Sequence, residues 1–250
     1  FEKFIAYSRQ DVDLLVRLDA KLQFIDLANV LAHSNTVLLQ TTMGAVAQTD
    51  QAIVNEAHQQ GFIVPDKKFD KDTTQAAGAY VADPKRGMHK WIGSMDLNSL
   101  YPSIIRSCNM STETIVGQVR HTFTRDLLDK AKTVPEAWEG RFATPEYELV
   151  MDKDQAELMH IDFENGETFE ATGAEIYEII FNSGQPWIIS ANGTIFTYEK
   201  KGIIPGLLER WYAERKELQA KAVAAREEGG DKFAFWDKRQ LVKKINLNSL

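Results

Sequence analysis

The sequence predicts an α+β protein with helices at both ends of the chain and short strands between them. Apolar residues recur at helical spacing over residues 2–32 and continue less clearly to about residue 60. A second, strongly helical pattern runs from residue 202 to the end, whereas β-like runs broken by Gly, Asn and Pro fill residues 120–198. With 44% hydrophobic residues among 250, the chain can bury a substantial core.

The first helical segment is followed by an irregular connector over residues 61–90, where Gly, Pro and charged residues interrupt every apolar run. Residues 91–97 are apolar and end in a polar turn, so we expect a buried strand with Asp96 at its C-terminal end. Pro102 suits a first helical turn, which predicts a short helix over Ser103–Cys108. A strand, a turn and a helix in this order suit a functional site.

The remaining elements are a small α+β insertion over residues 120–198 and a helical hairpin over residues 202–250. The β-like runs of the insertion are residues 147–150, 187–189 and 194–196. The apolar side of the first hairpin helix consists of Leu208, Trp211, Tyr212, Leu218 and Val223. Because Gly229 and Gly230 stop this helix and a second one follows at once, we expect the two helices to be antiparallel.

Composition excludes several classes of protein. Cys108 is the single cysteine and the five histidines do not pair at ligand spacing, so disulfide frameworks and zinc sites are excluded. No apolar run approaches the roughly 20 residues that span a bilayer, and the first residues show no basic region followed by an apolar stretch and a cleavage site. We expect a cytoplasmic protein without a membrane partner. Because the chain opens at Phe1 and stops at Leu250 inside a helical pattern, we also expect a fragment of a longer protein.

The net charge of −7 argues against a nucleic-acid partner, since phosphate binding relies on Lys and Arg. The charge is unevenly distributed, however. Residues 1–119 carry 11 basic and 13 acidic groups (−2), residues 120–198 carry 6 and 15 (−9), and residues 199–250 carry 12 and 8 (+4). The basic excess of the last segment can attract phosphate, whereas the acidic middle should avoid DNA.

The most specific string in the chain is Asp-Leu-Asn-Ser-Leu-Tyr-Pro-Ser-Ile-Ile, residues 96–105. An aspartate at the end of a strand can present its carboxylate to Mg²⁺, and the turn after it can offer backbone groups to phosphates. An isolated Asp and Tyr would more simply be a helix cap and a core aromatic. The whole string, however, resembles the first polymerase motif of family B DNA polymerases, Asp-x-x-Ser-Leu-Tyr-Pro-Ser-Ile-Ile.

This resemblance implies a metal site and a nucleotide site at the string. Asp96 would bind the catalytic Mg²⁺ ions, two per active site, with the Leu97 carbonyl as a further ligand. The backbone of Ser99 and Leu100 would contact the incoming triphosphate. Tyr101 would be the steric gate that excludes a ribose 2′-hydroxyl.

The hairpin carries a second set of candidate residues, Arg215, Lys216, Lys243, Lys244 and Asn248. Residues 244–250 resemble the second polymerase motif of the same family, Lys-x-x-x-Asn-Ser-x-Tyr-Gly, up to the point where the chain stops. The resemblance implies that Lys244 and Arg215 bind the triphosphate and that Asn248, on the Lys244 face, lies near the nascent base pair. Alone, such charges would more often form a solvated helix face.

The first hairpin helix departs from the family pattern at one position. Many relatives place a second basic residue one turn after the Arg, where this sequence has Gln219. Lys216 or Lys221 would have to compensate, although neither lies on the Arg215 face of an ideal helix.

The N-terminal helix carries the pattern Tyr-x-x-x-Asp at Tyr7 and Asp11, which resembles the third exonuclease motif of the proofreading domain. The resemblance implies that Asp11 binds a metal and that Tyr7 orients the attacking water. The pattern is loose, but it precedes the first polymerase motif by about 85 residues, the order that the family requires.

Residues 162–164 have the Asp-x-Glu form of another exonuclease motif in the wrong order, so we assign them to the insertion. Residues 78–80, Gly-Ala-Tyr, resemble a linking element of the family or form a plain turn.

The resemblance divides the chain into the end of a 3′-5′ exonuclease domain (1–60), a connector (61–90), the start of the palm with its insertion (91–201) and the fingers (202–250). T-even-type phage replicative polymerases are the most similar members, through Ser111–Ile115 and Gly202–Pro205. The 29 positions between Arg215 and Lys244 instead match the shorter fingers of cellular members.

The intact protein is expected to be a DNA-directed DNA polymerase that binds primer-template DNA and dNTP, with a sliding clamp and other replication proteins as candidate partners. The second acidic polymerase motif and the earlier exonuclease carboxylates are absent from these 250 residues, so the fragment alone should be inactive. Two alternatives are a non-catalytic nucleic-acid-binding module and an RNA-synthesising polymerase. The gate role of Tyr101 argues against the second.

Overall fold

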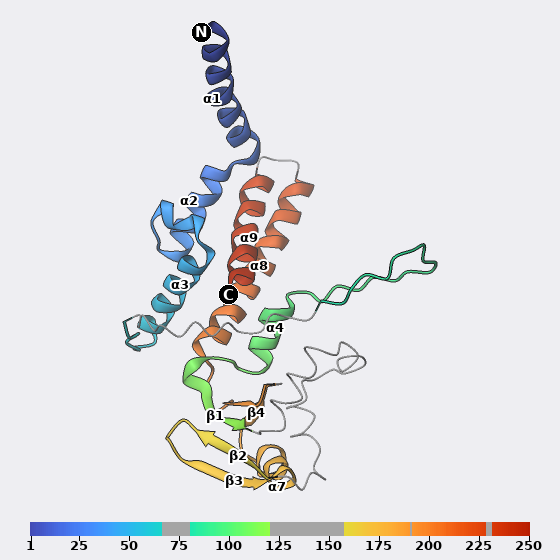
Figure 1. The fold of residues 1–250 in the computed structure, drawn as a ribbon. Helices are drawn as coiled ribbons and strands as arrows, with labels where there is room; N and C mark the ends of the chain where they lie inside the picture. The colour runs from blue at the N-terminus through green and yellow to red at the C-terminus, as the bar shows by residue number, and fades with distance from the viewer. Residues whose placement is uncertain (67–80, 121–157, 191, 229–231) are drawn as a thin grey trace.

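The computed structural model describes residues 1–66, 81–120, 158–190, 192–228 and 232–250. The molecule is elongated, with helix α1 at one end, a helical body in the middle and a five-stranded sheet at the other end (Figure 1). The predicted α+β class is therefore confirmed. None of the described helices combines the length and the apolar character needed to cross a membrane.

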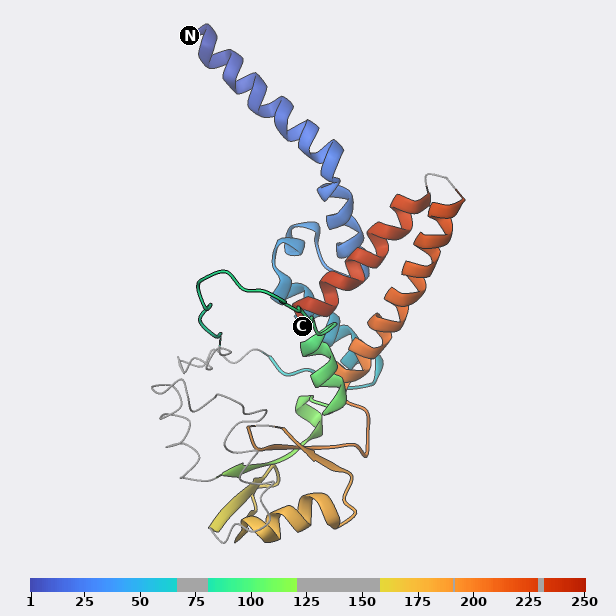
Figure 2. The ribbon, with the colours of Figure 1, turned by 90° about the vertical axis from the view of Figure 1, so that its right-hand side faces the viewer.

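The N-terminal segment is helical, as predicted. It contains α1 (Glu2–Leu22), α2 (Phe24–Asn35), the 3₁₀ helix η1 (Leu39–Met43) and α3 (Ala45–Gln59). Gln23 adopts a left-handed conformation with φ 54°, which ends α1 and turns the chain into α2. No residue of α1 is buried, and α1 projects from the body while α2 and α3 pack against the hairpin helices (Figure 2).

The connector contains no helix or strand within its described residues, 61–66 and 81–90, and residues 78–80 lie outside the described part of the chain. The predicted buried strand over residues 91–97 is wrong. This segment is extended but exposed, with Trp91 fully accessible to solvent, and it projects from the body. A strand needs a neighbour for its backbone hydrogen bonds, and no described strand pairs with this segment.

The helix after this segment, α4 (Leu100–Ser107), begins three residues earlier than predicted. Ser99 precedes it in a left-handed conformation with φ 53°, and Pro102 lies buried in the first turn. That position suits proline because the first-turn amides have no partner inside the helix. The chain then forms the short 3₁₀ helix η2 (Thr112–Thr114) and enters the sheet.

The sheet is antiparallel and has the strand order β3-β2-β1-β5-β4. Its strands are β1 (Ile115–Arg120), β2 (Leu158–Phe163), β3 (Thr168–Thr172), β4 (Trp187–Ile189) and β5 (Thr194–Thr197). The predicted strands at 187–189 and 194–196 are confirmed, whereas the run 147–150 lies outside the described residues. Residues 162–164 lie at the end of β2 and in the turn after it, within the expected insertion.

One face of the sheet packs against α7 (Gly173–Tyr177) and the π-helical turn η4 (Glu178–Asn182). Alternate residues of β2, Met159 and Ile161, point into this core, while His160 and Asp162 point away. The core also contains Val119, Ala171, Ile176, Ile180, Ile189 and Ile195. The sheet therefore has a hydrophobic core of its own.

The last two helices, α8 (Ile203–Glu227) and α9 (Lys232–Ser249), form the predicted antiparallel hairpin (Figure 1). A second core joins them to α3 through Ala52, Leu207, Leu208, Trp211 and Leu247. Val223 departs from the predicted apolar side, because it is exposed while the small Ala222 and Ala225 are buried. Small side chains there let the two helices approach closely.

Candidate functional site

The first motif lies on the exposed approach to α4. Asp96, Leu97, Leu100 and Tyr101 are all exposed, and 69% of Tyr101 is accessible to solvent. Tyr101 is therefore not a core aromatic in the described structure. Asp96 is not a helix cap either, since the residue before α4 is Ser99 and no side chain caps this end.

α4 connects the first motif to the hairpin, since it packs against both α8 and α9. Ile105 joins the core of the hairpin. The guanidinium of Arg106 lies 5.2 Å from the centre of the Tyr212 ring and 3.9 Å from the Glu209 carboxylate. The first motif is thus brought next to the base of the hairpin that carries the second set of candidate residues.

The hairpin places its candidate cations at one level. An ion pair of 2.6 Å joins Glu214 of α8 to Lys243 of α9, so the next residues, Arg215 and Lys244, lie at the same height on the two helices. Lys244 and Asn248 are exposed on one face of α9. The Nε of Arg215 is buried and has no hydrogen-bond partner among the described residues.

The two lysines considered as replacements for the missing base at Gln219 contact aromatic rings. The Lys216 ammonium lies 5.6 Å from the centre of the Tyr212 ring, and the Lys221 ammonium lies 5.2 Å from that of Trp236. Each ammonium group therefore lies over an aromatic ring, Lys216 over Tyr212 and Lys221 over Trp236.

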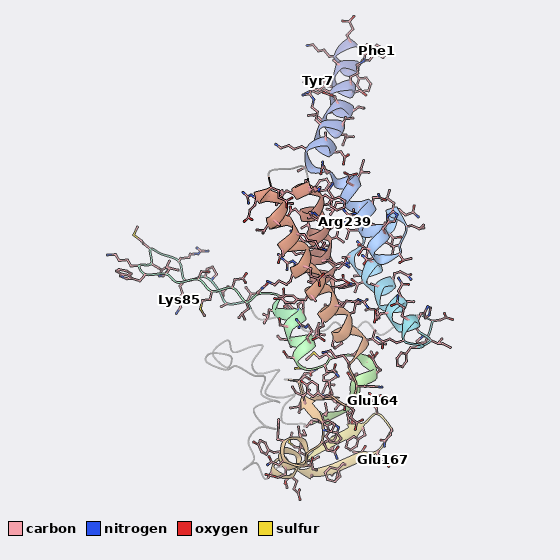
Figure 3. The ribbon with its side chains drawn as sticks, turned by 180° about the vertical axis from the view of Figure 1, so that it is seen from behind. Phe1, Tyr7, Lys85, Glu164, Glu167 and Arg239 are labelled. Carbon is pink, nitrogen blue, oxygen red and sulfur yellow. The ribbon has the colours of Figure 1, made fainter. Side chains whose placement is uncertain are left out.

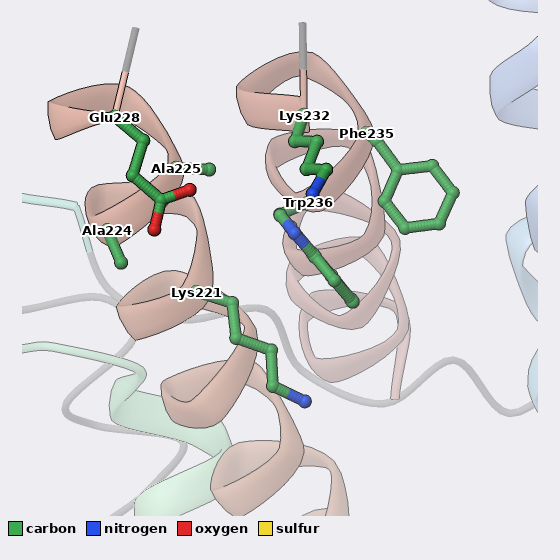
Figure 4. A pocket seen from close by; sticks show the side chains of 7 residues that line it. All are labelled: Lys221, Ala224, Ala225, Glu228, Lys232, Phe235 and Trp236. Carbon is green, nitrogen blue, oxygen red and sulfur yellow. The ribbon is translucent and has the colours of Figure 1, made fainter. Parts of the chain in front are cut away.

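Lys221 also borders a cavity of about 570 Å³ near the tip of the hairpin. Figure 4 shows Lys221 and Glu228 on α8 on one side, and Lys232 and Trp236 on the nearer side of α9, with the ring of Phe235 directed away from α8. The lining residues Lys221 and Trp236 lie about two turns from Arg215 and Lys244, and no residue of the first motif lines the cavity.

A polar network at the start of α8 was not predicted from the sequence. Asn109 is buried, donates hydrogen bonds to the carbonyls of Thr197 and Lys200 at 2.7 and 2.8 Å, and accepts one from the Gly202 amide at 3.0 Å. The Glu113 carboxylate accepts a hydrogen bond from the Ile203 amide. These contacts satisfy amides at the first turn of α8 that have no partner inside the helix.

Glu113 is an ionised acceptor in this network. Partial burial raises the pKa of Glu113, but hydrogen bonds from the amides of Ile203 and Glu113 and from the hydroxyls of Ser111 and Thr112 outweigh this effect. The pKa is therefore held below its ordinary value. Both sides of this network lie in segments that resemble the family, Ser111–Ile115 and Gly202–Pro205. The resemblance gave no indication that the two segments are in contact.

The Tyr7 and Asp11 pair lies on α1, away from the other candidates. Both residues are exposed on the helix that projects from the body, one turn apart on the same side. Figure 3 shows Tyr7 on this projection and Lys85 on the separate extended segment that leads to Asp96. The structure therefore does not bring the two acidic motifs together.

The residues present fit part of a magnesium site. Among the described residues, no group of three His, Cys, Asp or Glu side chains could hold a metal. Asp96 and the carbonyl of Leu97 offer two oxygen ligands, and Mg²⁺ in phosphate-transferring sites takes one or two carboxylates together with substrate phosphates. Further carboxylates would have to come from elsewhere.

Comparison with known proteins identifies the class of protein. Residues 36–250 match the family model described as DNA polymerase family B. The chain is 29% identical to a DNA polymerase of Paramecium bursaria Chlorella virus NY2A over 98% of its own length and 22% of that protein. It is 31% identical to the DNA-directed DNA polymerase of Escherichia phage RB69 over 54% of its own length and 15% of that protein. The corresponding protein of Enterobacteria phage T4 is 32% identical over 48% of this chain and 13% of the relative.

The chain spans 13 to 22% of the length of these three relatives. The chain belongs to DNA polymerase family B.

Proposed function

We propose that this chain forms the nucleotide-binding part of the polymerase site in a DNA-directed DNA polymerase, together with the last acidic motif of its proofreading exonuclease. The observation that carries the proposal is the packing of α4, which follows the first motif, against the hairpin that carries Arg215 and Lys244. The two segments that resemble the first and second polymerase motifs are thus linked by the packing of α4 against α8 and α9.

In this proposal residues 1–60 are the end of the 3′-5′ exonuclease domain, 61–90 a connector, 91–201 the start of the palm with its acidic insertion, and 202–250 the fingers. Asp96 and the Leu97 carbonyl would hold Mg²⁺, which supplies charge stabilisation during nucleotidyl transfer. The exposed Tyr101 would meet the sugar of the incoming dNTP, beside triphosphate contacts from the backbone of Ser99 and Leu100.

The cations of the hairpin would bind the leaving pyrophosphate. Arg215 is the α8 cation that lies at the level of Lys244, as the neighbouring ion pair of Glu214 and Lys243 indicates. Lys244 would approach the same phosphates from α9, and Asn248 would lie near the nascent base pair. Fixed positive charge around the phosphates is what phosphoryl transfer requires.

The proofreading site would be a separate centre. Asp11 would bind a metal ion and Tyr7 would orient the attacking water on α1, with the other carboxylates supplied from outside this chain. The absence of buried residues from α1 supports this assignment, since a helix with so many exposed apolar residues is suited to packing against another domain.

The rival function is a nucleic-acid-binding module without catalysis. A primer-extension assay of the whole polymerase that contains this chain separates the two. The proposal expects extension of a primer-template with dNTP and Mg²⁺, its loss when the metal is chelated, and no extension by residues 1–250 alone. Binding of primer-template by the whole protein without any extension would support the rival.

A further inference from the structure

We infer that Asn246 is a positioning residue that sets the rotation of α9 and thereby directs Lys244 and Asn248 toward the incoming nucleotide. The inference rests on the proposed function of the hairpin. It concerns a residue at one of the variable positions inside the second motif, for which neither the sequence nor the comparisons indicate a role.

Asn246 forms a reciprocal pair with Asn35 at the end of α2. The Asn35 amide nitrogen donates to the Asn246 oxygen at 3.0 Å, and the Asn246 amide nitrogen donates to the Asn35 oxygen at 2.9 Å. Both residues are almost fully buried, with 2% and 3% of their surface accessible. The two amides therefore satisfy one another across 211 positions of sequence.

A third buried amide orients the pair. Gln48 of α3 accepts the other N–H of Asn35 at 3.2 Å and donates to the Thr42 carbonyl at 2.7 Å. The amide nitrogen and the amide oxygen of Asn35 therefore both have hydrogen-bond partners. Because the Asn35 amide is held in one orientation, the Asn246 amide can pair with it in one orientation only. Buried polar groups that are satisfied in this way rigidify a core, whereas a purely apolar contact between helices has no preferred direction.

The geometry of α9 relates this pair to the nucleotide-binding face. Lys244 and Asn248 lie two positions before and after Asn246, which is roughly 200° around a helix of 3.6 residues per turn. Both are exposed, whereas Asn246 is buried against α2 and α3. When Asn246 is held inward, the two candidate ligands of the nucleotide must face outward, and a rotation of α9 would move both of them.

Two further contacts join α9 to α2 and α3. The Lys238 ammonium pairs with Asp26 of α2 at 3.0 Å, and the Thr49 hydroxyl donates to the Ser249 carbonyl at 3.2 Å. The first contact lies about two turns from Asn246 and is partly exposed, so it controls the rotation of the motif less directly.

The test is steady-state single-nucleotide incorporation by the whole polymerase, with dNTP varied and primer-template saturating. Asn246→Leu and Asn35→Leu each remove the amide of one member of the pair while keeping four side-chain heavy atoms branched at Cγ. Each should raise KM for dNTP about tenfold and change kcat less, because the ligands of the triphosphate lose their fixed direction. Asn35→Leu is the more telling variant, because Asn35 lies outside the second motif. The double variant should be no worse than either single variant, since the two residues act as one unit.

Val242→Ala is the matched control, because it opens a small cavity one turn earlier in the same helix and removes no hydrogen bond. It should lower the melting temperature and leave KM for dNTP within about twofold. If it raises KM as much as Asn246→Leu does, general loosening of α9 explains the effect and the inference is overturned.

Lys244→Ala distinguishes the inference from the proposed function. An unchanged KM for dNTP in Lys244→Ala would refute the nucleotide role of the hairpin. A raised KM in Lys244→Ala together with unchanged KM values in the folded Asn35 and Asn246 variants would refute the positioning role alone.

Discussion

The carboxylate of Glu113 accepts a hydrogen bond from the amide of Ile203, 90 positions further along the chain, and so caps α8 from outside the helix. The hydroxyl of Ser111 lies 2.8 Å from the same carboxylate and 3.4 Å from the Ile204 amide. This loop therefore joins the first motif, which lies just before it, to the start of the hairpin. The position of the hairpin on the first-motif helix depends on contacts of this kind.

Replacing Glu113 should loosen the first turn of α8. Glu113→Ala removes the cap, and a lost cap typically costs about 1 kcal/mol, so the Ile203 amide should exchange with deuterium about five- to tenfold faster at pH 7. Because the pKa of Glu113 is lowered by folding, its stabilisation is present above the unfolded-state pKa of about 4.3 and is lost as the pH falls through the lower folded value.

The difference in exchange between Glu113→Ala and the parent should accordingly shrink as the pH falls below about 4.3 and the carboxylate becomes protonated. Glu199→Ala, which replaces an exposed glutamate close to the start of α8, serves as the control and should match the parent throughout this pH range. A difference for Glu113→Ala that does not depend on pH would show that the carboxylate charge has no part in the cap.

The same junction makes Gly202 intolerant of a side chain. A Cβ at Gly202 would lie 2.7 Å from the Ser111 Cβ and 3.1 Å from the Pro205 Cδ, whereas a Cβ at Gly206 would meet only the Lys201 Cγ at 3.7 Å. Gly202→Ala should therefore lower the free energy of unfolding by about 1–3 kcal/mol. Gly206→Ala should leave it unchanged or raise it by up to about 1 kcal/mol, because alanine favours helix. Equal stability of the two variants in thermal unfolding would disprove the close contact.

The helices were predictable because their signal is local. The apolar spacing of α2 and the stop at Gly229 and Gly230 are visible in the sequence without knowledge of any distant residue. The strand predicted over 91–97 failed for the converse reason, since an apolar run becomes a strand only beside a partner, and the described chain provides none.

The candidate site was predictable as separate strings but not as an arrangement. Family motifs pointed to Asp96 and Lys244 individually, and the structure adds that α4, the helix that follows Asp96, packs against the helix that carries Lys244. The contacts from Glu113 to Ile203 and from Asn35 to Asn246 span 90 and 211 positions, and no periodic pattern marks residues so far apart as partners. Such contacts arise from tertiary packing and become visible only in the folded chain.

Asp11 should separate proofreading from synthesis. Asp11→Ala in the whole polymerase is expected to suppress degradation of single-stranded 3′ ends and to spare primer extension, because α1 is distant from the first motif. Asp13→Ala is the matched control, since it removes only an exposed ion pair with Arg17 on the same helix, which is worth little, and should spare both activities. Equal loss of both activities in Asp11→Ala would indicate a folding defect.

Tyr101 should control the choice of sugar. If its exposed ring lies under the deoxyribose, Tyr101→Ala or Tyr101→Val should raise the use of ribonucleotides relative to deoxyribonucleotides by about 100-fold, equivalent to roughly 3 kcal/mol of steric exclusion. Tyr101→Phe keeps the ring and should keep the discrimination. Incorporation kinetics with matched nucleotides measure the ratio, and an unaltered ratio in folded Tyr101→Ala would exclude the gate.

The most direct measurement of the central claim is the rate of single-nucleotide incorporation by Asp96→Ala in the whole polymerase. A methyl group cannot replace a metal ligand, so the rate should fall at least about 100-fold while degradation of single-stranded 3′ ends continues. Asp83→Ala, at an exposed position earlier on the same extended segment, should incorporate nucleotides at the parent rate. Retention of more than about a tenth of the parent rate by folded Asp96→Ala would remove Asp96 from the metal site and contradict the proposed polymerase centre.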